Sequence, residues 1–283
     1  MSELTAPLGI NHFGKVPLLD WLREVKQAGY QAVDYSAAAG KMAGDEAALA
    51  AVRRFSQDLD LIPAATHFRS FGFGFLRPGE QRQAFLRESV EDVRAAGFLG
   101  VRAIAFHLGN NLSLGPGSTE NSLAEANAEA LRDAVHVAEE EGVSVALENH
   151  CHGYGDRWEH LEVVARLLDS PAVGFTLDTG HAVVAGQSPA DLARRMGTRL
   201  MLTHLHDNDG AADQHRPAGR RGPNGESEGG VIDWPALIAA LREVDYPQRN
   251  VWMLEGGTQV PGDDVTQLLV AHRRAFIALL ASS

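Results

Sequence analysis

Short apolar runs alternate with longer amphipathic stretches along the chain, and this alternation predicts the secondary structure. Eight runs rich in Val, Ile, Leu and Ala are typical of strands buried in a parallel sheet. They lie within residues 7–13, 26–36, 59–68, 94–109, 140–150, 170–181, 198–207 and 248–257. Between them, apolar residues recur about 3.6 positions apart, as in amphipathic helices. These predicted helices cover residues 17–28, 45–58, 79–95, 119–141, 157–169, 233–243 and 263–280, and the shorter stretch 188–196 opens with the Ser-Pro pattern of a capped helix.

The alternation also predicts how the elements assemble. Eight strands alternating with eight helices, without a break in composition, predict an α/β fold of the (β/α)8 TIM barrel type, as a single domain over residues 1–283. The alternative is a doubly wound open sheet. The segment NHFGK after the first strand lacks the G-x-G-x-x-G pattern, so the main support for a dinucleotide-binding fold is missing. Gly29, Gly97 and Gly142 are expected to end helices in the left-handed conformation.

Composition narrows the class of partner. The 37 acidic and 25 basic side chains give a formal charge of −12, which disfavours nucleic acid and anionic membranes but leaves a local basic patch open. No apolar run reaches the roughly 20 residues of a membrane span, and no signal peptide is visible. Cys151 is the single cysteine, which fits a reducing compartment. We therefore expect a cytoplasmic protein without a membrane partner; a homo-oligomer stays open.

Every predicted strand ends in an ionisable residue, and in a barrel these ends converge on one mouth. The eight residues are His12, Asp34, His67, His107, Glu148, Asp178, His204 and Glu255. Crowded acids and imidazoles would repel one another or lie unpaired, and a divalent metal resolves that conflict by binding them. The last four come from adjacent strands and form a hard donor set suited to Mn²⁺, Co²⁺ or Mg²⁺, with Zn²⁺ as an alternative. His206 follows His204 by two positions and can face the same interior, so spacing leaves the fourth ligand open between them.

Several motifs of the later half are similar to those of one superfamily. They are ALEN (146–149), LDTGHAVVAG (177–186), HLHD (204–207), DQH (213–215), IDW (232–234) and MLEG (253–256). With them the chain resembles the xylose isomerase-like TIM barrels, which include sugar phosphate isomerases and epimerases, and endonuclease IV. The resemblance implies that Glu148, Asp178, His204 and Glu255 bind the catalytic metal. It favours His204 over His206 because an H-x-x-D element runs from His204 to Asp207.

The resemblance also implies a reaction. A sugar, sugar phosphate or polyol is isomerised or epimerised by proton transfer through an enediolate, which a divalent metal stabilises. Glu148 and Glu255 are the implied proton-transfer residues, and the partner is a small carbohydrate. Which sugar, and whether it is phosphorylated, stays open. The expected substrate-binding residues are His181, His107, His67, His206, Asp213 and His215, whereas His150 and His152 are expected to be solvated.

Endonuclease IV supplies the main alternative, a zinc-dependent enzyme acting on abasic DNA with three metal ions. Candidates for its additional ligands are present at His67, His107, His181, Asp213 and His215. Against it, the surroundings of His67 lack the H-x-x-Y pattern, TGH replaces the more usual TCH, and the chain is acidic. Two further alternatives are a metal-dependent dehydratase of the inosose type and a sugar-binding barrel without catalysis.

Overall fold

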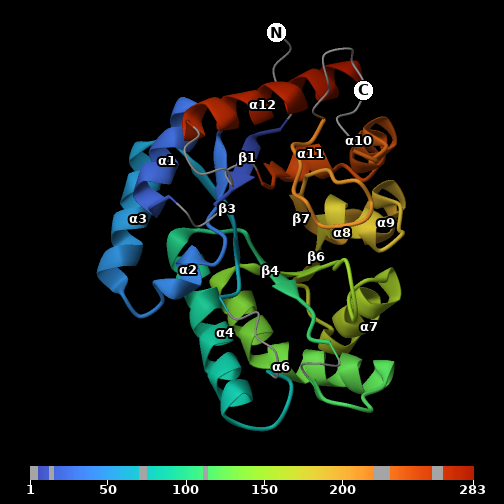
Figure 1. The fold of residues 1–283 in the computed structure, drawn as a ribbon. Coiled ribbons are helices and arrows are strands. Elements are labelled where there is room, and N and C mark those ends of the chain that lie inside the picture. The colour runs from blue at the N-terminus through green and yellow to red at the C-terminus, as the bar shows by residue number, and fades with distance from the viewer. Residues whose placement is uncertain (1–5, 13–15, 70–74, 111–113, 220–229, 257–263) are drawn as a thin grey trace.

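A computed structural model describes residues 6–12, 16–69, 75–110, 114–219, 230–256 and 264–283. Eight strands follow the eight predicted apolar runs (Figure 1). Each strand is shorter than its run, because the runs include the turns on either side. The strands are β1 (Leu8–Asn11), β2 (Ala32–Asp34), β3 (Ile62–His67), β4 (Ala103–His107), β5 (Ser144–Glu148), β6 (Val173–Asp178), β7 (Leu200–His204) and β8 (Trp252–Leu254).

All eight predicted helices form, and Figure 1 shows them surrounding the strands. They are α1 (Leu18–Gln27), α3 (Glu46–Asp58), α4 (Glu80–Leu99), α6 (Glu120–Glu141), α7 (Trp158–Leu168), α9 (Pro189–Met196), α10 (Trp234–Glu243) and α12 (Val265–Ser282). The short helices α2 (Ala38–Lys41), α8 (Thr179–Val184) and α11 (Tyr246–Arg249) lie in connections. Among the described residues, no helix combines the length and the apolar character that crossing a membrane requires.

The strands pair in parallel in the order β7-β6-β5-β4-β3-β2-β1-β8, so the first and last strands of the chain are neighbours. The sheet then closes between β7 and β8 through a parallel bridge from Leu205 to Leu254. There the amide of Leu205 donates to the carbonyl of Met253 at 2.9 Å. A doubly wound open sheet has no such closure. The predicted (β/α)8 barrel is confirmed.

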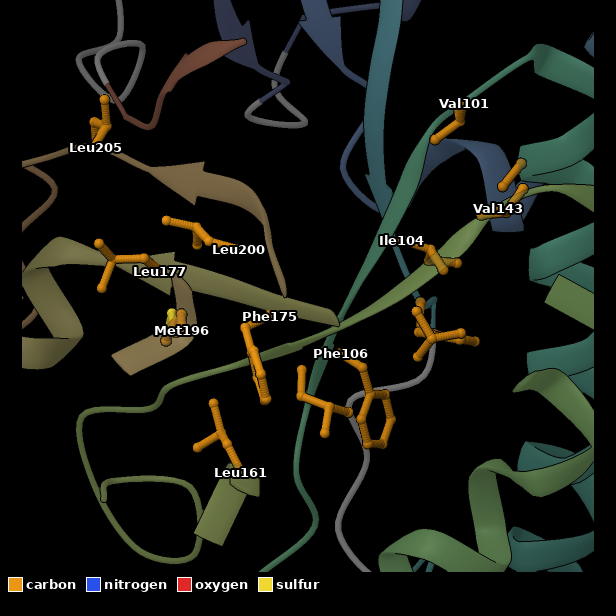
Figure 2. Close-up of a cluster of buried hydrophobic side chains, with 14 of the residues drawn as sticks. Val101, Ile104, Phe106, Val143, Leu161, Phe175, Leu177, Met196, Leu200 and Leu205 are labelled. Carbon is orange, nitrogen blue, oxygen red and sulfur yellow. The ribbon is translucent and has the colours of Figure 1, made fainter. Parts of the chain in front are cut away.

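Two apolar layers lie on opposite sides of this sheet. The larger layer packs strands against helices: Figure 2 shows Phe106, Phe175 and Leu177 of the strands in the same cluster as Leu161 of α7 and Met196 of α9. The smaller layer consists mainly of strand residues and fills the barrel interior: Ala32, Ala64, Ala65, Ala105, Leu202, Val251 and Met253. The interior is narrow, because a Cβ on Gly9 would lie 2.7 Å from the Met253 side chain. Small side chains at this level leave the strand ends above them for polar groups.

Side chains alternate between the two faces of a strand, so the residue two positions after an interior residue also points inward. Ala32, Ala105 and Met253 point inward. Two positions later, Asp34, His107 and Glu255 therefore point inward as well. In β1 the same parity leads from Gly9 to Asn11, which is 3% exposed and bonded to Glu255. The strand thus ends at Asn11, one residue before the predicted His12, although His12 also lines the cavity at the mouth. His12 bonds the Val16 carbonyl at 2.8 Å.

One predicted helix end is also wrong. Gly29 and Gly142 follow α1 and α6 with φ of +86° and +68°, as expected, but Gly97 lies inside α4. That helix continues to Leu99 and is capped by Gly100 at φ +76°. A Cβ on Gly97 would lie 2.6 Å from Glu141 at the end of α6. Gly97 therefore serves the close approach of two helices and not a chain reversal.

Candidate metal centre and substrate cavity

The ends of β5, β6, β7 and β8 bring four predicted ligands together. Glu148, Asp178, His204 and Glu255 each offer one ligand atom, and these atoms all lie within 4.8 Å of one another. His204 Nδ1 lies 2.8 Å from Glu148 Oε1, 3.5 Å from Glu255 Oε2 and 4.0 Å from Asp178 Oδ2. All four residues are buried, Glu255 being the most exposed at 7%. The structure thus forms a compact, dry set of three carboxylates around one imidazole.

Local hydrogen bonds hold Asp178 at this position. Its Oδ1 accepts the backbone N–H of His181 at 2.7 Å and so caps the short helix α8. The side chain of Asn149 donates to the Asp178 carbonyl and accepts from the Asp178 amide, both at 2.8 Å. Asp178 therefore caps the helix that follows its strand and also offers a ligand atom to the cluster. Asp178 aims its other oxygen at the cluster while the helix start fixes its backbone.

The three carboxylates of the cluster depend on neighbouring histidines for their charge balance. Among the described residues, the ion pairs of these three carboxylates involve histidines alone. Burial raises the pKa of Glu255 to about 7. Burial also opposes ionisation of Glu148, yet His107 and His204 hold its pKa well below the ordinary value. A divalent cation fits this donor set, because it replaces protons on buried carboxylates.

Unsatisfied oxygens support the same fit. Glu255 Oε2 is buried and makes no hydrogen bond to any described residue. Glu148 Oε2 is buried as well and lies 3.1 Å from His107 Nε2. Buried carboxylate oxygens are normally paired, and those that are not call for an ion or water. Both oxygens belong to the four-residue cluster.

A second layer of polar groups lies against His204. Its Nε2 is 3.4 Å from Asp34 Oδ2, and His67 Nε2 lies 3.2 Å from the same oxygen. The ring of His67 stacks on that of His204 with centroids 4.8 Å apart. Asp34 Oδ1 in turn accepts the Ser36 amide at 2.6 Å. His67, expected at the substrate, also lines the cavity but has its ring nitrogen turned towards Asp34.

His206 lies beside the cluster and hydrogen-bonds Asp178, whereas His204 hydrogen-bonds Glu148. His206 Nε2 is 2.9 Å from Asp178 Oδ1, and its ring stacks on His215 with centroids 4.3 Å apart. The ring also presses on Gly180, where a Cβ would lie 2.0 Å from His206 Cε1. The two histidines of HLHD thus have different places: His204 is one of the four cluster residues, and His206 holds Asp178 from the side.

The connection after β7 brings further predicted residues to the mouth. His181 Nδ1 donates to the Asn149 carbonyl at 3.0 Å, which leaves Nε2 at 3.3 Å from Asp213 Oδ2. Asp213 Oδ1 lies 3.5 Å from His215 Nδ1. Asp207 fastens this connection, accepting the Val231 amide at 3.0 Å and the Trp234 indole N–H at 2.8 Å. The acid of the H-x-x-D element therefore holds the loop and takes no place in the four-residue cluster.

A cavity of about 400 Å³ opens above the cluster, large enough for a small ligand. Every described residue that lines it has a hydrogen-bonding side chain: Asn11, His12, Ser36, His67, His107, Glu148, His150, His181, Asp213, His215 and Glu255. His150, expected in solvent, packs against His107 and His181 with centroids 4.9 Å away in each case. The loop after β5 turns His150 back towards the cavity, and the sequence alone does not show the course of that loop.

Comparison with known proteins agrees with the fold. The family described as xylose isomerase-like TIM barrel matches residues 22–272. An uncharacterised protein of Methanocaldococcus jannaschii is 30% identical over 132 residues, 44% of this chain and 42% of that protein. The inosose dehydratase of Geobacillus kaustophilus is 28% identical over 145 residues, 48% of this chain and 46% of the dehydratase. The matched part of the chain thus spans less than half the length of these relatives.

Two solved structures share the whole fold. A D-tagatose 3-epimerase-like protein superposes with a TM-score of 0.81 at 18% identity, covering 97% of both chains. The IolI protein, crystallised with a bound zinc atom, gives a TM-score of 0.76 at 15% identity and covers 98% of both chains. At these identities the likeness concerns the fold.

Proposed function

Because the chain belongs to the xylose isomerase-like TIM barrel family, we propose that it is a divalent-metal-dependent isomerase or epimerase of a sugar, sugar phosphate or related polyol ketone. The observation that carries the proposal is the buried cluster of Glu148, Asp178, His204 and Glu255 beneath a cavity lined by hydrogen-bonding side chains. Mn²⁺, Co²⁺ or Mg²⁺ suits three carboxylates and one imidazole, and the zinc atom of IolI makes Zn²⁺ a further candidate.

The four cluster residues would hold the cation, which supplies Lewis acidity to a carbonyl oxygen of the substrate. Glu148 and Glu255 both lie close to His204 Nδ1 and both line the cavity. In the metal-free protein their surroundings push their pKa values in opposite directions, down for Glu148 and up to about 7 for Glu255. Cation binding releases the proton of Glu255. Glu148 then accepts the proton from the carbon beside the carbonyl, and Glu255 delivers to that carbon a proton taken up from solvent.

The cavity residues would orient the substrate for this transfer. His181 is fixed at Nδ1 by the Asn149 carbonyl, so its Nε2 faces the cavity side near Asp213. From there it can donate to a substrate oxygen as negative charge develops. His107, His67, His206 and His215 surround the same space or brace it, and a polyhydroxylated substrate offers matching hydroxyls. The proposed substrate is a carbohydrate of monosaccharide size.

Loss of a hydroxyl after the same proton abstraction would make the enzyme a dehydratase, as the partial likeness to an inosose dehydratase indicates. The purified protein with Mn²⁺ should therefore be incubated in D2O with ketohexoses and with inososes. We expect deuterium at the carbon beside the carbonyl, and loss of that label in Glu148→Gln. An epimer as product supports the proposal, and an unsaturated product assigns the dehydratase reaction. Full exchange by Glu148→Gln contradicts the proton-transfer role.

A nuclease like endonuclease IV is the second candidate. It is favoured by the convergence of His181, Asp213 and His215, whose polar atoms lie 3.3–3.5 Å apart. It is disfavoured by His67, which faces Asp34 and not the His107–Glu148 pair. Three zinc ions per chain, together with chelator-sensitive cleavage of an abasic duplex, would assign the nuclease and overturn the isomerase.

A further inference from the structure

Among the inward-pointing residues at the eight strand ends, Asn11 alone cannot ionise. Its amide is 3% exposed and lies at the end of β1, beside the end of β8. The register pairs Ile10 with Leu254, so the next residues along, Asn11 and Glu255, meet at the mouth of the barrel. Asn11 Nδ2 donates to Glu255 Oε1 at 2.9 Å across 244 positions of sequence. A buried amide is thus dedicated to one carboxylate of the cluster.

The orientation of this amide is settled by its other end. Asn11 Oδ1 accepts the backbone N–H of Gly256 at 3.1 Å. A rotated amide would set its NH2 against that N–H and its oxygen against the Glu255 carboxylate, giving two repulsive contacts. Gly256 has a φ of +100°, and a Cβ there would lie 2.7 Å from the His215 carbonyl. The glycine permits the turn that carries its N–H to Asn11.

This contact separates the two oxygens of Glu255. Oε1 receives the amide hydrogen of Asn11, whereas Oε2 is buried without a hydrogen bond in the described structure and lies 3.5 Å from His204 Nδ1. The last torsion of a glutamate is broad and nearly two-fold, so the side chain alone does not choose a carboxylate plane. The donor at Oε1 makes that choice.

We propose that Asn11 is a positioning residue that turns Glu255 Oε2 towards the cation and keeps Oε1 on the cavity side. This inference rests on the proposed metal-dependent function. It assigns to Asn11 no contact with the cation and no proton transfer. Groups that fix the orientation of a metal-binding side chain commonly change metal affinity about 10–100-fold when they are removed.

A merely structural link between β1 and β8 would stabilise the fold without affecting the cation. Asn127 provides the matched control, because its amide is fully buried and bonded to backbone only. Its Nδ2 donates to the carbonyls of Gly109 and Leu123 at 2.8 Å, and its Oδ1 accepts the Gly109 amide at 2.7 Å. Replacement of Asn127 removes as many hydrogen bonds as replacement of Asn11, or more.

The test is a Co²⁺ titration of the metal-free full chain, followed by the visible absorbance of the bound ion and by calorimetry. Asn11→Leu should raise the Co²⁺ Kd about 10–100-fold and change the absorbance spectrum. Asn127→Leu should lower the unfolding temperature and leave both the Kd and the spectrum at wild-type values. Asn11→Ser, which leaves room for water in place of the amide, covers the case in which Asn11→Leu fails to fold.

The outcomes separate the two proposals. If the wild type binds no divalent cation, the proposed function fails. If the wild type binds Co²⁺ and the folded Asn11 variants bind it with the same Kd and spectrum, the positioning role of Asn11 is overturned while the metal site stands.

Discussion

Gly180 should be irreplaceable because of one side chain, the imidazole of His206. A Cβ on Gly180 would lie 2.0, 2.6 and 2.8 Å from three atoms of that ring. His215 stacks on the same ring with centroids 4.3 Å apart, so His206 cannot move without losing contacts. Gly180→Ala must therefore displace His206 from Asp178, to which it is now bonded at 2.9 Å.

The size of the effect follows from two overlapping terms. Overpacking a close-packed site costs about 1–3 kcal/mol. Loss of a hydrogen bond to a buried charged group costs about 1.5–3 kcal/mol. Since one displacement produces both, we expect Gly180→Ala to lower the free energy of unfolding by about 2–4 kcal/mol. Alanine is the better helix former by about 1 kcal/mol, so in a His206→Ala background the same change should be neutral or slightly stabilising.

The assay is a double-mutant cycle measured by thermal and urea unfolding of the metal-free protein. Gly186→Ala is the control, because no atom lies within 4 Å of its Cβ position and its φ is +72°. Its cost should be the same with and without His206. An equal loss of stability for Gly180→Ala in both backgrounds would refute the reasoning, as would no loss in the wild type. A contact other than that with His206 would then be the reason for a glycine at position 180.

Three further outcomes follow from the site. Divalent-metal affinity should weaken by up to about tenfold per unit as pH falls below about 7, because Glu255, with its pKa raised to about 7 by burial, holds a proton that binding must release; calorimetry at several pH values measures this. Asp34→Asn should weaken metal binding about 10–100-fold in the same calorimetric titration, because it alters the partner 3.4 Å from His204 Nε2. Asp207→Ala should lower the free energy of unfolding by more than about 3 kcal/mol in urea denaturation, because it leaves the Trp234 indole and backbone amides without their acceptor.

The fold was predictable because its signals are local. Each apolar run is a strand, and each amphipathic stretch is a helix, to within a few residues. Gly97 misled because a glycine near a helix end and a glycine at a helix crossing look alike in one dimension. Its partner, Glu141, is 44 positions away along the chain. The difference is a tertiary contact, and no local pattern encodes it.

The residues of the candidate site were predictable from the sequence, but the contacts between them were not. The strand-end rule found Glu148, Asp178, His204 and Glu255 without any knowledge of distances. In β1 all four residues are buried, so the sequence does not show which of them point into the barrel. The strand-end rule therefore selected His12 and not Asn11. Gly9, the small interior residue two positions before Asn11, was the available signal.

The central claim is that one cation binds where β5 to β8 end, and a crystal grown with Mn²⁺ tests it directly. The anomalous difference map should show one strong peak, at about 2.0–2.3 Å from ligand atoms of Glu148, Asp178, His204 and Glu255. Asp178→Asn should weaken or remove that peak. No peak between these four residues, or one confined to His181, Asp213 and His215, would contradict the account.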